Sequence, residues 1–150
     1  MSAPFEAAAV SLPGSGQPSR AFGRRTFRIT AAETGGAMTV WDEPVAPGDG
    51  PPLHVYHRED EMFRVLEGRF HFWCGGQDFE AGPGACMVLP RGVPHRFQNV
   101  GDREGLLTIV LTPGGLENFF VEVERQPPGT PEEVAALAAR YGVEFPPSQG

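Results

Sequence analysis

The side chains best suited to metal chemistry in this 150-residue chain are its four histidines, His54, His57, His71 and His95. Two of them lie in a polar stretch, residues 54–61, that also contains Tyr56 and ends at Glu61. Imidazole nitrogens and a carboxylate oxygen together suit Fe, Mn, Ni, Cu or Zn. A single histidine is more often structural than a ligand, so the residues around these four decide the interpretation. His71 lies mid-strand between aromatic neighbours and is interpreted as structural.

The spacing of the polar residues sets a geometric condition for a shared site. His54 and Glu61 are seven positions apart, so on one regular strand they would point to opposite faces. They converge only if the strand is interrupted, and we expect a solvated turn or bulge over the charged run 57–60. His95 shares a strand face with Phe97, which directs both side chains inward.

The elements that must hold these residues are predicted to be short strands. The 20 Gly and 16 Pro residues argue against a helical bundle and favour many strands joined by turns. The predicted strands cover residues 25–30, 37–41, 53–56, 61–66, 69–74, 85–89, 95–99 and 106–112. Residues 42–52 are predicted to be a loop. Both faces of the strand predicted at 69–74 carry bulky side chains, so both faces are expected to be buried, which favours a closed barrel.

Three segments are expected along the chain. Residues 1–20 are predicted to be a flexible N-terminal tail, 21–115 a β-barrel and 116–150 a helical C-terminal extension. The extension contains two helix candidates. The first, residues 116–123, gives mixed signals for secondary structure. Thr130 followed by Pro131 is a stronger helix start, and Gly142 is a plausible C-terminal cap.

Composition excludes several classes of function. The net charge of −7 makes nucleic acid and anionic membranes improbable partners. All 12 basic residues are Arg, which excludes Schiff-base chemistry and a P-loop lysine. Cys74 and Cys86 are too few for a disulfide framework, and we expect both to be buried small hydrophobes. No apolar run reaches the ~20 residues of a membrane span, and residues 1–20 read poorly as a signal peptide, so a cytoplasmic protein is expected.

Two spaced motifs resemble those of the cupin superfamily. The first motif consists of Gly48, His54, Tyr56, Glu61 and Gly68. Tyr56 stands at the position where the family has its second histidine. The second is matched at every position by Gly84, Pro90, Gly92, His95 and Asn99. In style the chain is similar to the small single-domain, quercetin-dioxygenase-like cupins. The resemblance implies an all-β fold, a double-stranded β-helix or jelly-roll barrel with a short C-terminal helix, and a homodimer.

The resemblance also implies a ligand set: His54, the residue at 56, Glu61 and His95. Because residue 56 is tyrosine, three alternatives stay open. In the first, His54, Glu61 and His95 hold the metal, with the Tyr56 phenolate as an optional further ligand; two His and one carboxylate are typical of non-haem Fe(II) oxygenases. In the second, His57 takes the vacant position, which requires a local bulge. In the third, the metal is lost and the barrel binds a small molecule unaided.

Three functions follow from these alternatives. The first is a metal-dependent enzyme of the dioxygenase type acting on a small organic substrate, with Tyr56 as proton donor and Glu61 in the catalytic site. The second is a non-catalytic binding protein, a sensor or storage protein with a degenerate metal site. A dimerising scaffold ranks last. A group of apolar side chains either lines a ligand pocket or fills the barrel: Phe63, Phe70, Phe72, Met87 and Phe97.

Overall fold

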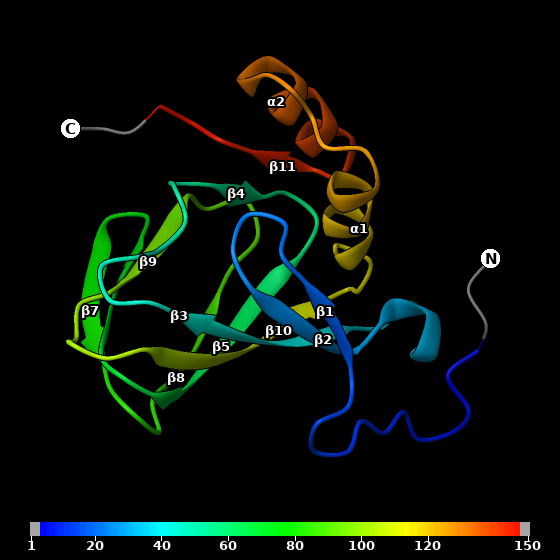
Figure 1. Cartoon of the computed structure of the whole chain (residues 1–150), viewed down its shortest axis with the longest axis horizontal. Helices are drawn as coiled ribbons and strands as arrows, with labels where there is room; N and C mark the ends of the chain where they lie inside the picture. The colour runs from blue at the N-terminus through cyan, green and yellow to red at the C-terminus, as the bar shows by residue number, and fades with distance from the viewer. Residues whose placement is uncertain (1–3, 148–150) are drawn as a thin grey trace.

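The computed structural model describes residues 4–147 and is built mainly from antiparallel strands (Figure 1). The strands are β1 (Gln17–Ser19), β2 (Arg25–Ile29), β3 (Thr39–Val45), β4 (Val55–Tyr56), β5 (Asp60–Glu67), β6 (Phe70–Cys74), β7 (Gln77–Ala81), β8 (Cys86–Leu89), β9 (His95–Asn99), β10 (Gly105–Thr112) and β11 (Val143–Glu144). The helices are α1 (Glu117–Arg125) and α2 (Pro131–Arg140), and a 3-10 turn covers Ala31–Glu33.

The strands form two principal sheets that pack on each other. One has the order β1-β2-β3-β10-β5-β8, the other β7-β6-β9, and β11 pairs with β4 in a separate two-stranded ladder. This arrangement confirms the predicted all-β jelly-roll of the double-stranded β-helix type. The structure differs from the predicted barrel in one respect. The hydrogen-bonded ladders of the described strands remain separate sheets and do not form one closed barrel.

The core lies between the two sheets and is rich in aromatic side chains. Phe63 on β5 packs edge-on against Phe72 on β6 and Phe97 on β9, with ring centroids 5.1 and 5.5 Å apart. The alternate residues of these strands are buried because successive side chains point to opposite faces of a sheet. The predicted aromatic residues therefore fill the barrel, except that Phe97 also borders a cavity.

Two helices form at the two helix candidates of the sequence, where the resemblance implies one short helix, and they cover one end of the sheets (Figure 1). The α2 start is as predicted, because the Thr130 side chain accepts a hydrogen bond from the Glu133 backbone N–H. The α1 helix buries Phe120 against Trp41 and Phe27, with centroids 5.7 and 6.2 Å apart. This tertiary packing stabilises α1, whose local sequence favours no single secondary structure.

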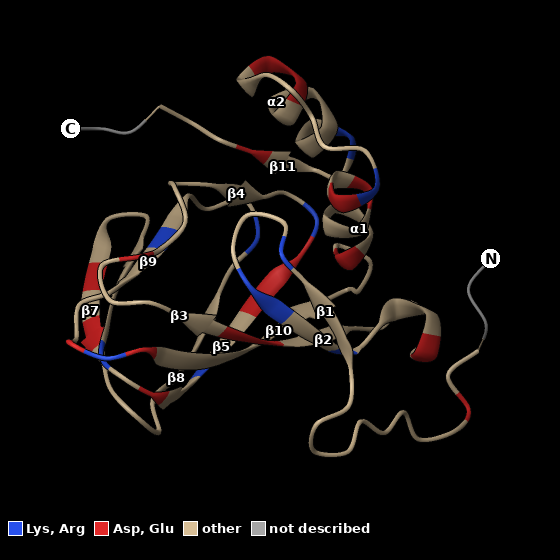
Figure 2. Cartoon of the chain, in the orientation of Figure 1, with Lys and Arg blue, Asp and Glu red and all other residues tan. Residues whose placement is uncertain are grey.

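Charged residues occur on strands of both sheets and on both helices (Figure 2). Acidic residues mark both helices and β7, whose Asp78 and Glu80 are exposed. No helix among residues 4–147 is both long enough and apolar enough to cross a bilayer.

The structure corrects several expectations at the borders of the elements. Strand β1 lies inside the predicted tail, and the Ser11 and Leu12 carbonyls accept hydrogen bonds from Arg28; residues 1–3 lie outside the described part. Strand β3 continues to residue 45, into the predicted loop 42–52. Strand β7 was not predicted, because its polar residues show no apolar alternation. Cys86 is exposed and free, whereas Cys74 is buried as predicted.

Candidate metal centre

Three of the predicted ligands meet inside the fold. One ligand atom from each of His54, Glu61 and His95 lies within 4.8 Å of the other two. The side chains are almost fully enclosed, with exposed fractions of 5%, 3% and 2%. Such burial of two imidazoles and a carboxylate is uncommon unless the groups are paired or bind a ligand.

Three chain segments bring these side chains together. His54 and His95 are joined by a two-residue bridge in which each backbone N–H donates to the other residue's carbonyl, at 3.1 and 2.9 Å. Glu61 comes from β5 in the opposite sheet, where it faces Leu111 and Leu89 in register. Residues 57–59 lie outside the strands, so the interruption required between His54 and Glu61 is confirmed.

The His54 ring is oriented and deprotonated for metal binding. Its Nδ1–H donates to the Pro52 carbonyl at 2.9 Å, which leaves Nε2 as the free lone pair. Burial, together with the charge of His95, lowers the pKa of His54 to about 3. This imidazole is therefore neutral throughout the physiological pH range.

His95 and Glu61 form a buried hydrogen-bonded pair. The distance from His95 Nε2 to Glu61 Oε1 is 2.8 Å, and His95 Nδ1–H donates to the Val93 carbonyl at 3.2 Å. Burial lowers the pKa of His95, but the hydrogen bond and the negative charge of Glu61 outweigh it, so the net shift is upward. A proton on His95 Nε2 thus lies where a metal ion bound to that nitrogen would lie.

Tyr56 adjoins the centre, whereas His57 and His71 do not. The Tyr56 ring centroid lies 4.9 Å from that of His54 and 5.4 Å from that of His95. Burial, reinforced by the negative charge of Glu61, raises the pKa of Tyr56 well above its usual value. His57 is exposed and its Nε2 lies 2.8 Å from Glu144 Oε1, so the structure does not bring it into the cluster of His54, Glu61 and His95. His71 instead packs on Trp73, consistent with a structural role.

The donor set of this centre fits a divalent transition metal. Ligand atoms that bind a common ion through bonds of about 2.1 Å are at most ~4.2 Å apart, which is close to the 4.8 Å within which these three atoms lie. Both imidazoles donate Nδ1–H to a backbone carbonyl, the usual outer support of a metal-binding histidine. The coarse prediction of a site able to hold such a metal is supported; the metal's identity is left open.

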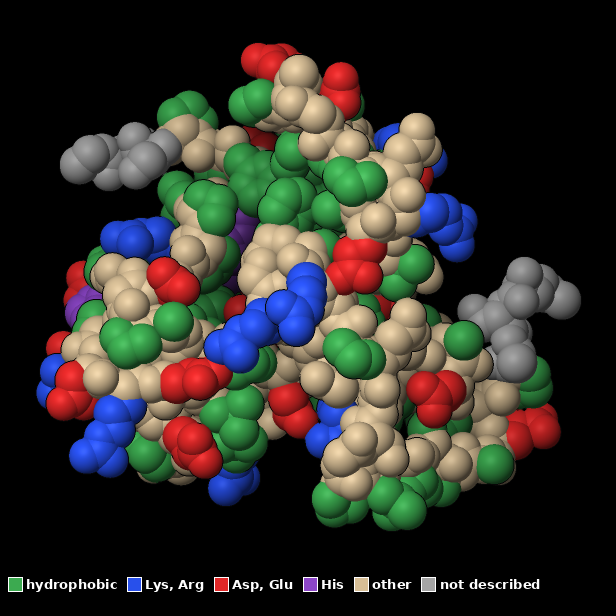
Figure 3. Space-filling model, in the orientation of Figure 1, with side chains coloured by type: hydrophobic (Ala, Val, Ile, Leu, Met, Phe, Trp, Pro, Cys, Tyr) green, Lys and Arg blue, Asp and Glu red, His purple; other side chains and the backbone are tan. Residues whose placement is uncertain are grey.

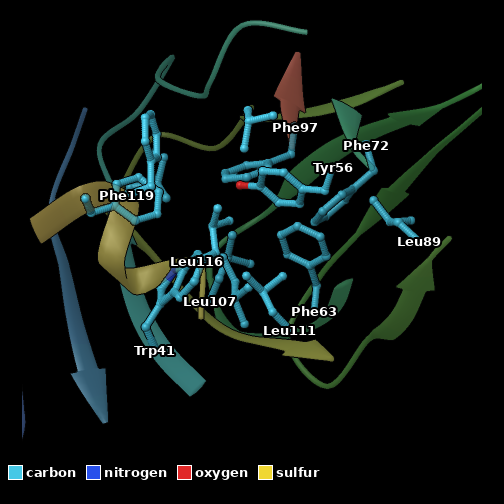
Figure 4. Packing of buried hydrophobic residues seen from close by; sticks show 14 of the residues in the cluster. Trp41, Tyr56, Phe63, Phe72, Leu89, Phe97, Leu107, Leu111, Leu116 and Phe119 are labelled. Carbon is cyan, nitrogen blue, oxygen red and sulfur yellow. The ribbon is translucent and has the colours of Figure 1, made fainter. Parts of the chain in front are cut away.

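A cavity of about 1260 Å³ opens beside the centre and is bordered by His54, Tyr56 and Glu61. In Figure 4 the Tyr56 ring lies among the core aromatics, and its hydroxyl oxygen points away from Phe72 toward Phe119. Figure 3 shows hydrophobic side chains gathered where the helices meet the sheets, with part of a histidine visible between them. The volume is ample for a small organic molecule.

The helical extension supplies a wall of this cavity that the sequence does not predict. Phe119 and Phe120 come from α1, Val134 and Ala135 from α2, and Phe145 follows β11. Amphipathic helices indicate packing on a barrel wall but do not reveal which barrel end they cover. Consequently the residues that border the cavity come from both ends of the chain and from the barrel.

Among the charged residues whose enclosure the sequence did not predict are Arg25, Glu43 and Glu59. Arg25 on β2 and Glu43 on β3 border the cavity, and burial raises the pKa of Glu43 despite the nearby Arg25 charge. Glu59, expected in a solvated run, is buried, and its Oε1 has no hydrogen-bond partner within residues 4–147. Burial raises the pKa of Glu59 to about 7. Charged residues next to loops are usually exposed, so nothing in the sequence distinguishes these three.

Parts of this chain are similar in sequence to a known domain family and to known proteins. Residues 41–111 match the family model described as the cupin domain. Over 108 residues the chain is 27% identical to the polyketide synthase CurC of Streptomyces cyaneus, covering 72% of this chain and 69% of that protein. Over 100 residues it is 30% identical to the quercetin 2,3-dioxygenase of Bacillus subtilis, covering 65% of this chain but only 29% of that enzyme.

A solved structure shows the same fold at lower identity. An RmlC-like cupin from Shewanella frigidimarina superposes with a TM-score of 0.62 at 16% identity, covering 76% of this chain and 98% of that one. The shared architecture therefore extends beyond the matched residues 41–111.

Proposed function

The chain belongs to the cupin superfamily, and from that premise we propose that it is a metal-dependent enzyme of the dioxygenase type that acts on a small organic molecule. The observation that carries the proposal is the buried cluster of His54, Glu61 and His95 at the edge of a large cavity. The similarity to a quercetin dioxygenase supports the reaction class. The similarity to CurC, a polyketide synthase, supports an organic substrate.

Each residue of the centre has a separate task in this proposal. His54, Glu61 and His95 would hold a divalent transition metal, which would supply Lewis-acid and redox chemistry. Glu61 contributes the negative charge that offsets part of the metal's charge. His95 gives up the proton that it shares with Glu61 when the metal binds.

Tyr56 is the proton donor in this scheme. Its raised pKa keeps the hydroxyl protonated at neutral pH, and the hydroxyl faces the cavity. It can therefore donate a hydrogen bond, or a proton, to an oxygen of a substrate held beside the metal ligands. The apolar cavity walls exclude water from the reacting groups and strengthen the electrostatic interactions among them.

Metal loading under anaerobic conditions tests the proposal. Protein treated with EDTA and then given Fe(II) should retain about one iron per chain by elemental analysis. His54→Ala should abolish retention, whereas the matched control His71→Ala, outside the centre, should not. Loaded protein should then consume O₂ when quercetin is added, and His54→Ala should not. Equal iron retention by the two variants, or none by the native protein, would contradict a metal enzyme.

The tyrosine at position 56 favours one second candidate, a non-catalytic binding protein. Tyrosine removes one of the four ligands that the family motif provides, while the cavity is kept. On this alternative Glu61→Ala leaves the affinity for an aromatic probe nearly unchanged, because no metal contributes to binding. A complete loss of affinity in that variant would reject the alternative.

A further inference from the structure

An exposed aromatic residue, Phe22, stands at the rim of the cavity. It lies in the turn between β1 and β2, on the side of the sheets that the helices cover (Figure 1). The residue borders the cavity, yet 53% of its surface is exposed. A side chain that both borders a cavity and faces solvent lies where the cavity opens.

The backbone of Phe22 adopts an unfavourable conformation. Its φ is 53°, and among residues 4–147 it is the only non-glycine residue with a positive φ. A bulky side chain is rare in this left-handed region, which glycine and asparagine occupy at lower cost. Strained residues of this kind persist where the surrounding structure holds them, and they cluster at functional sites.

Two neighbouring elements hold the turn in place. From β2, the enclosed Arg25 guanidinium donates to the backbone carbonyls of Ala21 and Phe22. From α1, the Glu124 carboxylate accepts a hydrogen bond from a backbone N–H of the turn. The Phe22 ring also stacks on Phe119 of α1, with ring centroids 5.9 Å apart and 24° between the ring planes. These contacts fix the aromatic ring at the rim.

Folding alone does not account for a phenylalanine at position 22. Asparagine or glycine would strain the turn less, and about half of the residue gains nothing from burial because it is exposed to water. One face of the ring rests on Phe119, so the exposed remainder is open to another molecule. A ligand that covers this remainder offsets both costs.

The cavity wall beside Phe22 limits the chemistry of such a ligand. The residues of 117–146 that border the cavity, Phe145 among them, are all uncharged. At another place in the wall, His54 and Glu61 present ionisable groups, and both of these residues are almost fully enclosed. A molecule with one polar end and a long apolar part matches this contrast between an enclosed polar cluster and an apolar rim.

We propose that Phe22 determines specificity by packing against the apolar end of a ligand whose polar end lies at the metal-binding cluster. Arg24, which also borders the cavity, pairs with Glu104 Oε1 at 2.5 Å, so its charge is already matched. The assignment rests on the proposed function for the idea that the cavity receives the substrate. It deepens that proposal by naming the part of the substrate that is recognised at the rim.

Binding of two alcohols of different length to metal-free protein tests the proposal. Isothermal titration calorimetry in EDTA compares 1-decanol with 1-hexanol, which share a hydroxyl end and differ only in the length of the alkyl chain. The native protein should bind 1-decanol at least tenfold more tightly, because each buried methylene strengthens binding about fourfold. The measurement needs no metal, so failure of the metal-dependent proposal does not affect it.

Variants at position 22 then assign the preference to the aromatic ring. Phe22→Asn suits the left-handed backbone but removes the ring, so it should lose about tenfold in affinity for 1-decanol and little for 1-hexanol. Phe22→Tyr keeps the ring and should bind both alcohols as the native protein does. Phe5→Asn is the matched control, because Phe5 is 50% exposed and lies outside the cavity wall; it should change neither affinity.

Thermal unfolding separates a ligand-binding role from a structural one. Phe22→Asn removes backbone strain together with the contact to Phe119, so the midpoint should stay within a few degrees of the native value. A fall of about 10 °C or more would show that the ring serves the fold, and this result would overturn the proposal.

Several binding results would also overturn it. The first is a native protein that binds neither alcohol or binds both equally. The second is a Phe22→Asn variant that weakens both alcohols to the same extent, which indicates a change of cavity shape, or weakens neither. The third is the same loss in Phe5→Asn or in Phe22→Tyr. If Phe22→Asn does not fold, Phe22→Gly takes its place with the same expected losses, because glycine also suits the backbone of this turn.

Discussion

Replacing Glu61 by glutamine tests whether the charge of this carboxylate holds a proton on His95. The two groups are 2.8 Å apart and both are buried, so the hydrogen bond is charge-assisted when His95 is protonated. Such a bond contributes about 1.5–3 kcal/mol. At about pH 5.5, below the ordinary histidine pKa, the variant should lose about that amount of its free energy of unfolding.

The deficit should disappear as the pH rises. The folded-state pKa of His95 is raised, so the stabilisation is fully present below the unfolded-state pKa and is lost as the pH passes the folded-state value. Above the folded-state pKa, the neutral His95 ring still donates its Nδ1–H to the Val93 carbonyl. Its Nε2 then carries no proton, so Nε2 and the Glu61 carboxylate are both hydrogen-bond acceptors and no longer attract each other. A glutamine amide can donate to that nitrogen, so at about pH 9 the variant should be at least as stable as the native protein.

Guanidinium unfolding in EDTA at the two pH values measures the difference directly. Glu67→Gln, at the exposed end of the same strand, is the control and should be neutral at both. If Glu61→Gln is destabilised equally at both pH values, the proton on His95 is not what Glu61 stabilises, and the reasoning fails.

Three further outcomes are expected. Tyr56→His should raise Zn²⁺ affinity about tenfold or more in calorimetry, because it adds an imidazole beside the two present; unchanged affinity would mean that the position is not directed at the ion. Glu59→Gln should gain stability relative to the native protein as the pH rises from about 5 to 8 in urea titrations, because the raised pKa makes ionisation of the native carboxyl destabilising in that range; parallel pH curves would contradict this. Gly50→Ala should cost about 3 kcal/mol in thermal unfolding, since a Cβ there would lie 1.9 Å from the Phe97 carbonyl oxygen, whereas Gly76→Ala, with open space around it, should be nearly neutral.

The sheet core could be predicted from local patterns, whereas the ligand cluster was predicted from the resemblance of two spaced motifs to those of the cupin superfamily. Alternation of apolar side chains identified β6, β9 and β10, and an odd spacing of seven residues identified the interruption between His54 and Glu61. These features require only the two-residue period of a strand and the reach of a turn. The three side chains meet where two spaced motifs predict them.

The rest depends on long-range packing that leaves no local pattern. Arg25 is buried because Phe120 of α1 packs on its guanidinium, and the neighbouring Glu43 side chain is only 15% exposed; a charged residue in a strand gives no sign of such cover. Strand β11 is two residues long and exists through its pairing with β4. Glu59 is buried although its neighbour Arg58 is exposed, a contrast that only tertiary contacts decide.

The pairing of β11 with β4 sets Val143 opposite Tyr56 and so ties the end of the chain to the strand beside the metal ligands. The three side chains of the metal-binding cluster therefore lie in the sheets and at the bridge before β4, while residues 117–146 supply one wall of the cavity. Exchanging that stretch between relatives would change this wall and leave His54, Glu61 and His95 in place. The cavity can therefore vary in shape without any change to the cluster beside it.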